Sequence, residues 1–187
     1  MGHGALDAPP TGAVSIVRAT SAHVPAVRAA LYEAMCWREA LPRRHMDDVL
    51  ADPAANLYVE NWGRPGDVGF VAQDASGFHG GAAWYRVFTA DHHGYGFLSP
   101  RVPEVSMGLQ QSWRGLGLGR KLLENLHAAA LDLGVSRLSL SVDVSNLRAM
   151  RLYERFGYVP RGIVGGSRTM EVQLLPETIA PVTRVPD

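Results

Sequence analysis

The sequence predicts one domain of the α/β class. Segments in which apolar and polar residues alternate, as in half-buried strands, are interleaved with segments whose apolar residues recur every three or four positions, as in amphipathic helices. The chain has 187 residues, enough for one domain with a sizeable core, and its sequence contains no internal repeat and no linker. We expect the domain to span residues 13–175, between a flexible Gly- and Pro-rich segment (1–12) and an irregular tail with three prolines (176–187).

The first half of the domain predicts a strand, two helices and a hairpin. "VSIVRAT" alternates as a strand, and a helix follows from about Ser21 to Ala40, with Thr20 or Ser21 as its cap. "RRHMDDVLADP" predicts a shorter helix that ends near Pro53. "DVGFVAQDASGFHGGAAWYRVFTA" predicts two strands joined by a turn at "DASG".

The second half predicts two helices between strands. A loop rich in Gly, Pro and His covers residues 91–103, and "EVSMGLQ" follows as a strand. The longest helix is expected from Gly117 to Leu133, with Gly134 as its stop. "SRLSLSVDV" predicts a strand, Asn146 to Phe156 a short helix, and "YVPRGIV" with "SRTMEVQLL" a closing hairpin.

The composition argues against several classes of function. Eighteen basic residues balance eighteen acidic ones, so no excess charge would attract nucleic acid or an acidic membrane. Cys36 is the only cysteine, which excludes an internal disulfide and a multi-cysteine zinc site. No stretch resembles a membrane span or a signal peptide. We expect a cytoplasmic protein with no metal, no nucleic-acid partner and no membrane partner.

One short stretch, "VSMGLQQSWRGLGLGRKLL", joins an expected strand to the longest expected helix. It places glycines at every second position, Gly115, Gly117 and Gly119. Glycine allows a tight turn, and it lets backbone N–H groups approach a ligand where a Cβ would be in the way. Because the start of a helix also favours negative charge, this junction predicts an anion-binding loop.

The spacing of the glycines separates three kinds of anion site. A P-loop requires Lys followed by Ser or Thr, whereas Lys121 is followed by Leu122. A dinucleotide fingerprint requires G-x-G-x-x-G, and here the third glycine comes one place early, although Asp143 could serve as the ribose-binding acid. The remaining pattern is [Q/R]-x-x-G-x-G, which the residues from Arg114 to Gly119 match.

That pattern resembles a signature of the GNAT superfamily of acyl-CoA-dependent N-acetyltransferases. A second block, "SVDVSNLRAMRLYERFGYVP", is similar to the family signature N-x-x-A-x-x-L-Y-x-x-x-G-[FY] and follows one helix and one strand later. The resemblance extends from about Val14 to Leu175. It implies a mixed, mostly antiparallel central sheet of about six to seven strands flanked by helices, and a single N-acetyltransferase domain over residues 13–175.

The resemblance also implies the reaction. The chain would move an acetyl group from acetyl-CoA, its co-substrate, to a primary amine of a small molecule or peptide by direct nucleophilic attack. Loop amides would hold the pyrophosphate, the preceding strand would pair with the pantetheine arm, and the Leu109 N–H would meet the thioester carbonyl. The expected cofactor-binding residues are Met107, Gly108, Leu109, Arg114, Gly115, Leu116, Gly117, Leu118, Gly119, Arg120 and Asn146.

Two residues are expected to move protons. Tyr153 lies on the apolar stripe of its helix, which by itself indicates a core aromatic, but the resemblance places its hydroxyl beside the coenzyme A sulfur as general acid. The family often has an acidic base early in the strand before the loop, and Glu104 is the only acid there. Pro103 occupies the position expected for that base, so His92 and His93 are alternative bases.

The acceptor pocket is expected between the first helix and the 91–103 loop. Its candidate residues are Glu33, Trp37, His93 and Tyr95, because an acid can attract an ammonium and aromatic rings can hold its apolar or cationic part. None of them selects among a polyamine, an amino acid, an aminoglycoside and a peptide N-terminus. A non-catalytic acyl-CoA-binding module and a nucleotide-binding oxidoreductase are the alternative functions, and a homodimer is compatible with the sequence.

Overall fold

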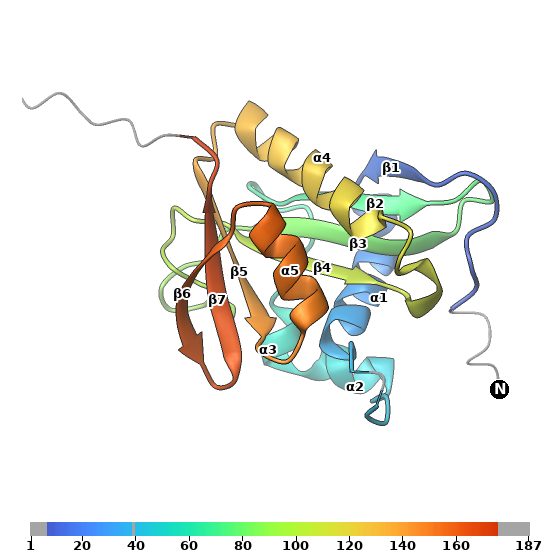
Figure 1. The fold of residues 1–187 in the computed structure, drawn as a ribbon, viewed down its shortest axis with the longest axis horizontal. Helices are drawn as coiled ribbons and strands as arrows, with labels where there is room; N and C mark the ends of the chain where they lie inside the picture. Colours follow the sequence, from blue (N-terminus) through green and yellow to red (C-terminus); the bar gives the residue numbers. More distant parts are fainter. Residues whose placement is uncertain (1–6, 39, 176–187) are drawn as a thin grey trace, which may run out of the picture.

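The protein is built on one seven-stranded sheet in this computed structural model, which describes residues 7–38 and 40–175 (Figure 1). The strands are β1 (Ser15–Arg18), β2 (Val68–Gln73), β3 (His79–Arg86), β4 (Glu104–Leu109), β5 (Arg137–Asp143), β6 (Val159–Val164) and β7 (Ser167–Gln173). Their order across the sheet is β1-β2-β3-β4-β5-β7-β6. Only β4 and β5 run parallel to each other, and every other neighbouring pair is antiparallel. The predicted fold class is confirmed.

Helices cover both faces of the sheet (Figure 1). One face carries α4 and α5, and the other carries α1 to α3. Leu122 and Leu126 of α4 pack with Val105 and Leu140 of the sheet, whereas the opposite face packs against α1. The helices are α1 (Val24–Met35), α2 (Met46–Ala51), α3 (Pro53–Asn56), α4 (Leu118–Asp132) and α5 (Leu147–Arg155), with 3₁₀ turns at Ser21–His23 and Gln111–Trp113.

Two helix boundaries differ from expectation. The first helix ends at Met35 rather than near Ala40, and the Cys36 N–H makes its last bond, to the Tyr32 carbonyl. Pro53, expected to stop a helix, begins α3 instead. Proline suits the first position of a helix because its missing N–H has no helical partner there.

The N-terminal segment that was expected to be flexible (1–12) is anchored where the structure describes it. The Asp7 carboxylate accepts hydrogen bonds from the backbone N–H and the hydroxyl of Ser112, at 2.9 and 2.8 Å. The Ala8 carbonyl accepts one from the indole N–H of Trp113 at 2.8 Å. Residues 1–6 and the expected tail (176–187) lie outside the described residues. No helix in the described ranges is long and apolar enough to cross a membrane.

The parallel strands β4 and β5 separate soon after they meet. Only two residue pairs join them, Glu104 with Ser139 and Val105 with Leu140. Beyond Val105 the two strands diverge, and α5 lies beside the opening (Figure 1). The edge of β4 that faces β5 is therefore left without a strand partner over its second half, which positions the cleft described below.

Helix α1 approaches β4 closely because Gly108 has no side chain. A Cβ on Gly108 would lie 1.8 Å from the Ala30 carbonyl oxygen of α1, well inside van der Waals contact. Any other residue at this position would push the helix away from the sheet. Gly108 thus sets the distance between α1 and the floor of the cleft.

Candidate functional site

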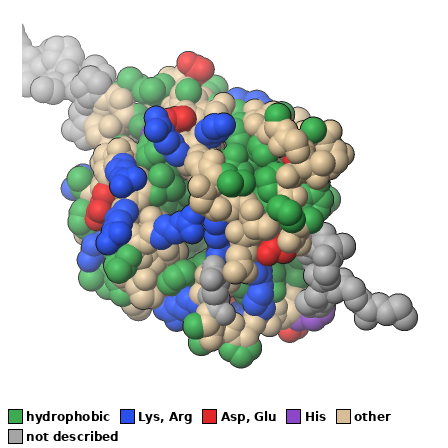
Figure 2. All heavy atoms as spheres, turned by 45° about the vertical axis from the view of Figure 1, so that its right-hand side comes forward, with side chains coloured by type: hydrophobic (Ala, Val, Ile, Leu, Met, Phe, Trp, Pro, Cys, Tyr) green, Lys and Arg blue, Asp and Glu red, His purple; other side chains and the backbone are tan. Residues whose placement is uncertain are grey.

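A large cleft of about 1530 Å³ opens where β4 and β5 diverge. It is lined by β4, the glycine loop, the start of α4, the end of β5, α5 and the C-terminal half of α1. Figure 2 shows a hollow with Lys and Arg side chains gathered around it. The arginines among its lining residues are Arg114, Arg120, Arg148, Arg151 and Arg155.

The glycine loop presents a row of free backbone N–H groups to this cleft. Within the described part of the chain, the amides from Gly115 to Arg120 donate to no acceptor. Gly117 caps α4 in the left-handed conformation, with φ of +75°, and a Cβ there would meet no atom within 4 Å. The loop and the first turn of α4 therefore form a concave set of donors suited to an anion.

The exposed edge of β4 adds two more donors. Gln110 N–H donates to the Gly80 carbonyl of β3, and Ser139 of β5 donates to the Pro103 carbonyl. Because alternate residues of a strand direct their backbone groups to opposite sides, Met107 and Leu109 direct theirs toward β5, into the cleft. The backbone groups of Gly108 point to β3. Met107 and Leu109 therefore stay candidate partners of an extended ligand. Gly108 lines the cleft as well, and in the structure it also admits α1.

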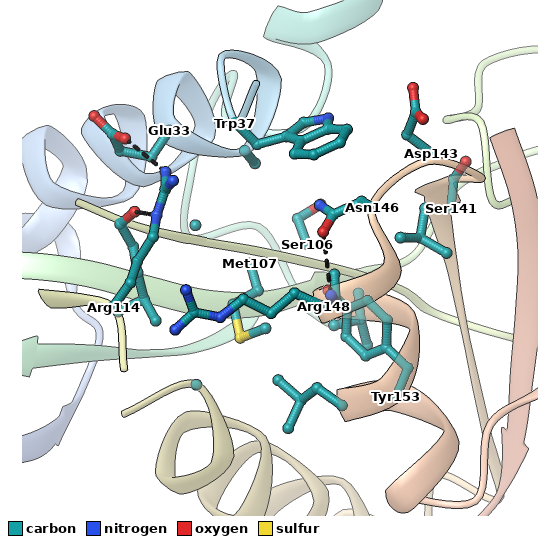
Figure 3. A pocket seen from close by; sticks show the side chains of 18 of the residues that line it. Glu33, Trp37, Ser106, Met107, Arg114, Ser141, Asp143, Asn146, Arg148 and Tyr153 are labelled. Atoms are coloured by element: carbon teal, nitrogen blue, oxygen red, sulfur yellow. Dashed lines mark hydrogen bonds and ion pairs between the residues drawn. The ribbon is translucent and has the colours of Figure 1, made fainter. Parts of the chain in front are cut away.

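Arg114 ties β4 to α1 at one end of the cleft. Its Nε donates to the Leu109 carbonyl at 3.0 Å, and its Nη2 lies 3.2 Å from Glu33 Oε2 (Figure 3). The other oxygen of Glu33 lies 2.5 Å from Arg43 Nη2. The buried Glu33 carboxylate, expected to attract a substrate ammonium, is thus already paired with two arginines.

Asn146 begins α5 and reaches the cleft. Its Oδ1 accepts the Ala149 N–H at 3.1 Å, the N-cap bond expected for this position (Figure 3). Its amide NH₂ has no hydrogen-bond partner among the described residues, so it can donate to a ligand in the cleft.

Tyr153 lines the cleft from the next turn of α5. Burial raises the pKa of its phenol to about 12, so it stays protonated at neutral pH. Its ring packs edge-on against Tyr158, with 5.6 Å between ring centroids, and its hydroxyl makes no hydrogen bond within the described chain. A protonated phenol without a protein partner can give its hydrogen bond to a ligand.

Glu104 lies at the start of β4 and is only 1% exposed. Its Oε1 accepts two hydrogen bonds, from the Tyr58 hydroxyl at 2.7 Å and from the Gly96 N–H at 2.8 Å. Its Oε2 is buried and has no partner among the described residues. Burial raises the pKa of the carboxyl to about 7, against the lowering effects of Tyr58, Gly96 and His93. This carboxyl can exchange a proton near neutral pH, through an oxygen that no protein group occupies.

The comparison with known proteins identifies the family. The profile of the Acetyltransferase (GNAT) family matches residues 30–158. The chain belongs to the GNAT acetyltransferase family.

Two curated relatives and one solved structure show how far the similarity extends. The chain is 32% identical over 108 residues to the mycothiol acetyltransferase of Propionibacterium freudenreichii, covering 58% of this chain but only 32% of that protein. It is 31% identical over 134 residues to the 5-NmdU N-acetyltransferase of Pseudomonas phage PaMx11, covering 67% of this chain and 87% of that one. The structure of yncA from Salmonella typhimurium, solved with its cofactor acetyl-CoA, superposes with a TM-score of 0.65 at 22% identity, over 94% of this chain and 99% of that one. That likeness shows the fold.

The structure brings most of the GNAT signature residues to one cleft. Trp37 and Tyr95 line it as expected, Tyr95 from the 91–103 loop with 53% of its surface exposed. Leu116 does not line it, and its side chain is exposed. The complete set of expected residues that do line it is Glu33, Trp37, Tyr95, Glu104, Met107, Gly108, Leu109, Arg114, Gly115, Gly117, Leu118, Gly119, Arg120, Asn146 and Tyr153.

Neither histidine of the loop lines the cleft. His92 Nε2 lies 3.1 Å from Glu60 Oε1 on the surface. His93 bonds to the Gly94 carbonyl at 2.9 Å, and its ring stacks on Phe97 with 4.4 Å between centroids. His93, expected in the acceptor pocket, is thus not among the lining residues of the cleft. The role of His92 or His93 as an alternative base stays a prediction.

The sequence analysis missed Tyr58 and the arginines of α5. Tyr58 follows α3 in the stretch "ANLYVEN", which carries no motif, and it meets Glu104 across 46 residues of chain. Arg148 lies inside the second signature block, at a position the signature leaves open. Its side chain reaches across the cleft toward the glycine loop (Figure 3), and its Nη2 lies 3.7 Å from where a Cβ on Gly115 would be.

Proposed function

We propose that this protein is an N-acetyltransferase that moves an acetyl group from acetyl-CoA to a primary amine of a small molecule or peptide by direct attack. The proposal is carried by one observation. Glu104 and Tyr153 line the same cleft as the free amides of the glycine loop, and the Glu104 Oε2 and the Tyr153 hydroxyl have no partner among the described residues. A binding module would have no need of the two titratable groups.

Acetyl-CoA fits the donors that line the cleft. The amides from Gly115 to Arg120 suit the pyrophosphate, and the guanidinium of Arg148 beside them adds positive charge. The outward-facing amides of Met107 and Leu109 suit the extended pantetheine arm, which would add to the edge of β4 as a strand does. The side-chain amide of Asn146 is a further donor. The Leu109 N–H is our candidate for polarising the thioester carbonyl.

Glu104 is the proposed general base. An alkylammonium has a pKa of about 10.4, so only about one molecule in a thousand is neutral at pH 7 and able to attack. With a pKa of about 7, the Glu104 carboxyl is ionised in a large share of molecules at neutral pH. Its Oε2 can accept the ammonium proton, because Oε1 is held by Tyr58 and Gly96.

Tyr153 is the proposed general acid. When the attacking amine expels coenzyme A, the leaving sulfur becomes a thiolate that is stabilised by a hydrogen bond and then a proton. The Tyr153 phenol is protonated throughout the neutral range and is unpartnered in the cleft. The direct route requires no covalent enzyme intermediate, and the only cysteine, Cys36, does not line the cleft.

Two measurements on the purified protein test the proposal. The first is a thermal-unfolding series with acetyl-CoA, ATP or NAD, which identifies the ligand that the folded protein binds. A bound ligand raises the midpoint of thermal unfolding by mass action. We expect a shift with acetyl-CoA alone. The second measurement is the rate at which free thiol is released from acetyl-CoA in the presence of primary amines, which tests for catalysis. A shift with acetyl-CoA but no thiol release above the protein-free rate with any primary amine would favour a binding module, and a shift with NAD alone would favour the oxidoreductase.

A further inference from the structure

The carboxylates that line the cleft are almost all paired with arginine. Of the residues that the structure describes, four acids line it, and three of these lie close to a guanidinium. Glu33 is 2.5 Å from Arg43 and 3.2 Å from Arg114, Asp143 is 2.5 Å from Arg38, and Glu124 is 2.7 Å from Arg120.

The fourth acid, Glu104, makes no ion pair with Lys or Arg in the described part of the chain, and the proposed reaction uses it as the base. Its carboxylate can receive the proton of the reacting amine. It cannot at the same time serve as the counter-charge of a second ammonium. An ammonium that enters a cleft without a counter-charge loses hydration that no ion pair replaces.

The arginines of α5 belong to the other end of the cleft. Arg148 reaches the glycine loop, where the proposed function uses it for the coenzyme phosphates. The cost of a second charge on the acceptor is therefore set by the paired carboxylates.

The acceptor end of the cleft offers aromatic surfaces instead. Trp37 follows α1 and Tyr95 belongs to the 91–103 loop, and both line the cleft together with Glu104. Tyr58 lines it too, but its ring is buried in the core against Phe88. The Tyr95 ring is half exposed and packs on no other aromatic ring in the described structure. Flat apolar walls of this kind suit a flat partner.

We propose that the acceptor is a primary amine carried on a flat, uncharged group, aromatic or heteroaromatic, with no second cationic centre. Polyamines and aminoglycosides are thereby excluded as preferred acceptors. This inference rests on the proposed acetyltransferase function and deepens it by naming the class of acceptor.

Four amines separate the two parts of the proposal. Benzylamine is flat with one amine, 1,4-bis(aminomethyl)benzene is flat with two, butylamine is aliphatic with one, and putrescine is aliphatic with two. The measurement is kcat/KM for each amine, from thiol release at saturating acetyl-CoA and a fixed pH. We expect the second amine to lower kcat/KM about tenfold or more within each pair, after correction for the two equivalent amines. We expect the ring to raise it several-fold.

Two matched pairs of variants tie these preferences to the cleft. Arg38→Gln frees the Asp143 carboxylate, so it should raise the putrescine-to-butylamine ratio several-fold, whereas Arg28→Gln removes the same charge from the exposed face of α1 and should leave the ratio unchanged. Tyr95→Leu should lower kcat/KM for benzylamine but not for butylamine. Leu98→Ala, at an exposed position in the same loop that does not line the cleft, should change neither value.

The outcomes distinguish the inference from the function on which it rests. If the diamines equal or exceed the monoamines, or if butylamine equals benzylamine, the acceptor class is wrong while the transferase function stands. If the putrescine-to-butylamine ratio of kcat/KM in Arg38→Gln stays at the wild-type value, the paired carboxylates do not set the selectivity and the inference fails. If acetyl-CoA binds but no amine releases thiol above the protein-free rate, the proposed function fails and the acceptor class fails with it.

Discussion

The buried Glu104 carboxyl should make the stability of the protein depend on pH in a way that a single substitution reveals. In the folded protein its pKa is raised to about 7, whereas in the unfolded chain it is the ordinary value of about 4.3. Below about pH 4 the group is protonated in both states and has no effect. Between about pH 4 and 7 the unfolded chain loses the proton first, so the folded state loses stability as the pH rises. At about 1.4 kcal/mol per pKa unit, the total loss is about 4 kcal/mol, of which about 3 kcal/mol falls between pH 4 and 8.

Glu104→Gln removes this titration and keeps an oxygen that can accept the bonds from Tyr58 and Gly96. The assay is denaturant unfolding of the ligand-free wild type and variant at several pH values from 4 to 8. The free energy of unfolding of the wild type minus that of the variant should fall by about 3 kcal/mol over this range. Glu154→Gln, at an exposed position of α5, is the control for loss of a carboxyl. A difference that stays flat with pH would refute the raised pKa, and with it the physical basis for Glu104 as the base.

Three further predictions concern single residues of the site. Tyr58→Phe removes a hydrogen bond that lowers the pKa of Glu104, so the acidic limb of kcat/KM should move to higher pH; an unmoved limb would leave Tyr58 with a packing role only. Tyr153→Phe should lower kcat by roughly 10²–10⁴ with the KM for acetyl-CoA little changed, and an unaltered kcat with chemistry rate-limiting would exclude the phenol as acid. Gly117→Val should abolish the thermal shift given by acetyl-CoA. The control is Gly134→Val, because Gly134 has a φ of +73°, close to the +75° of Gly117, and a Cβ at either position would meet no atom within 4 Å. This variant should lose similar stability but keep the thermal shift given by acetyl-CoA. Equal thermal shifts in the two variants would contradict the assignment of the loop to coenzyme A.

The spacing of the residues predicted the parts of the site that depend on local structure. The glycine loop lies where a strand ends and a helix begins, and the sequence places Asn146 at a helix start with Tyr153 seven positions further on. Within about two turns of a helix, spacing fixes which residues share a face. The loop, the helix cap and the phenol could therefore be assigned before the structure was known.

The contacts between distant segments could not be predicted in this way. In the sequence, Glu104 lies one residue after the position expected for the base, which Pro103 occupies. In the structure the Tyr58 hydroxyl and the Gly96 N–H hold one of its oxygens, and the other is buried without a partner among the described residues. Glu33 looked available for an ammonium, but Arg43 and Arg114 pair with it from ten and 81 positions away. Such pairings depend on the tertiary fold, which no local pattern records.

The measurement that tests the central claim most directly is the pH dependence of kcat/KM for benzylamine in the wild type and in Glu104→Gln. If Glu104 takes the proton from the bound ammonium, the wild-type value should rise through a pKa of about 7 and then level off until the amine itself deprotonates. Without the carboxylate only the rare neutral amine can react. The variant should therefore be slower at neutral pH, and its log kcat/KM should climb with unit slope up to the pKa of the amine. Profiles of the same shape and height in the two proteins would contradict the assignment of Glu104 as the base.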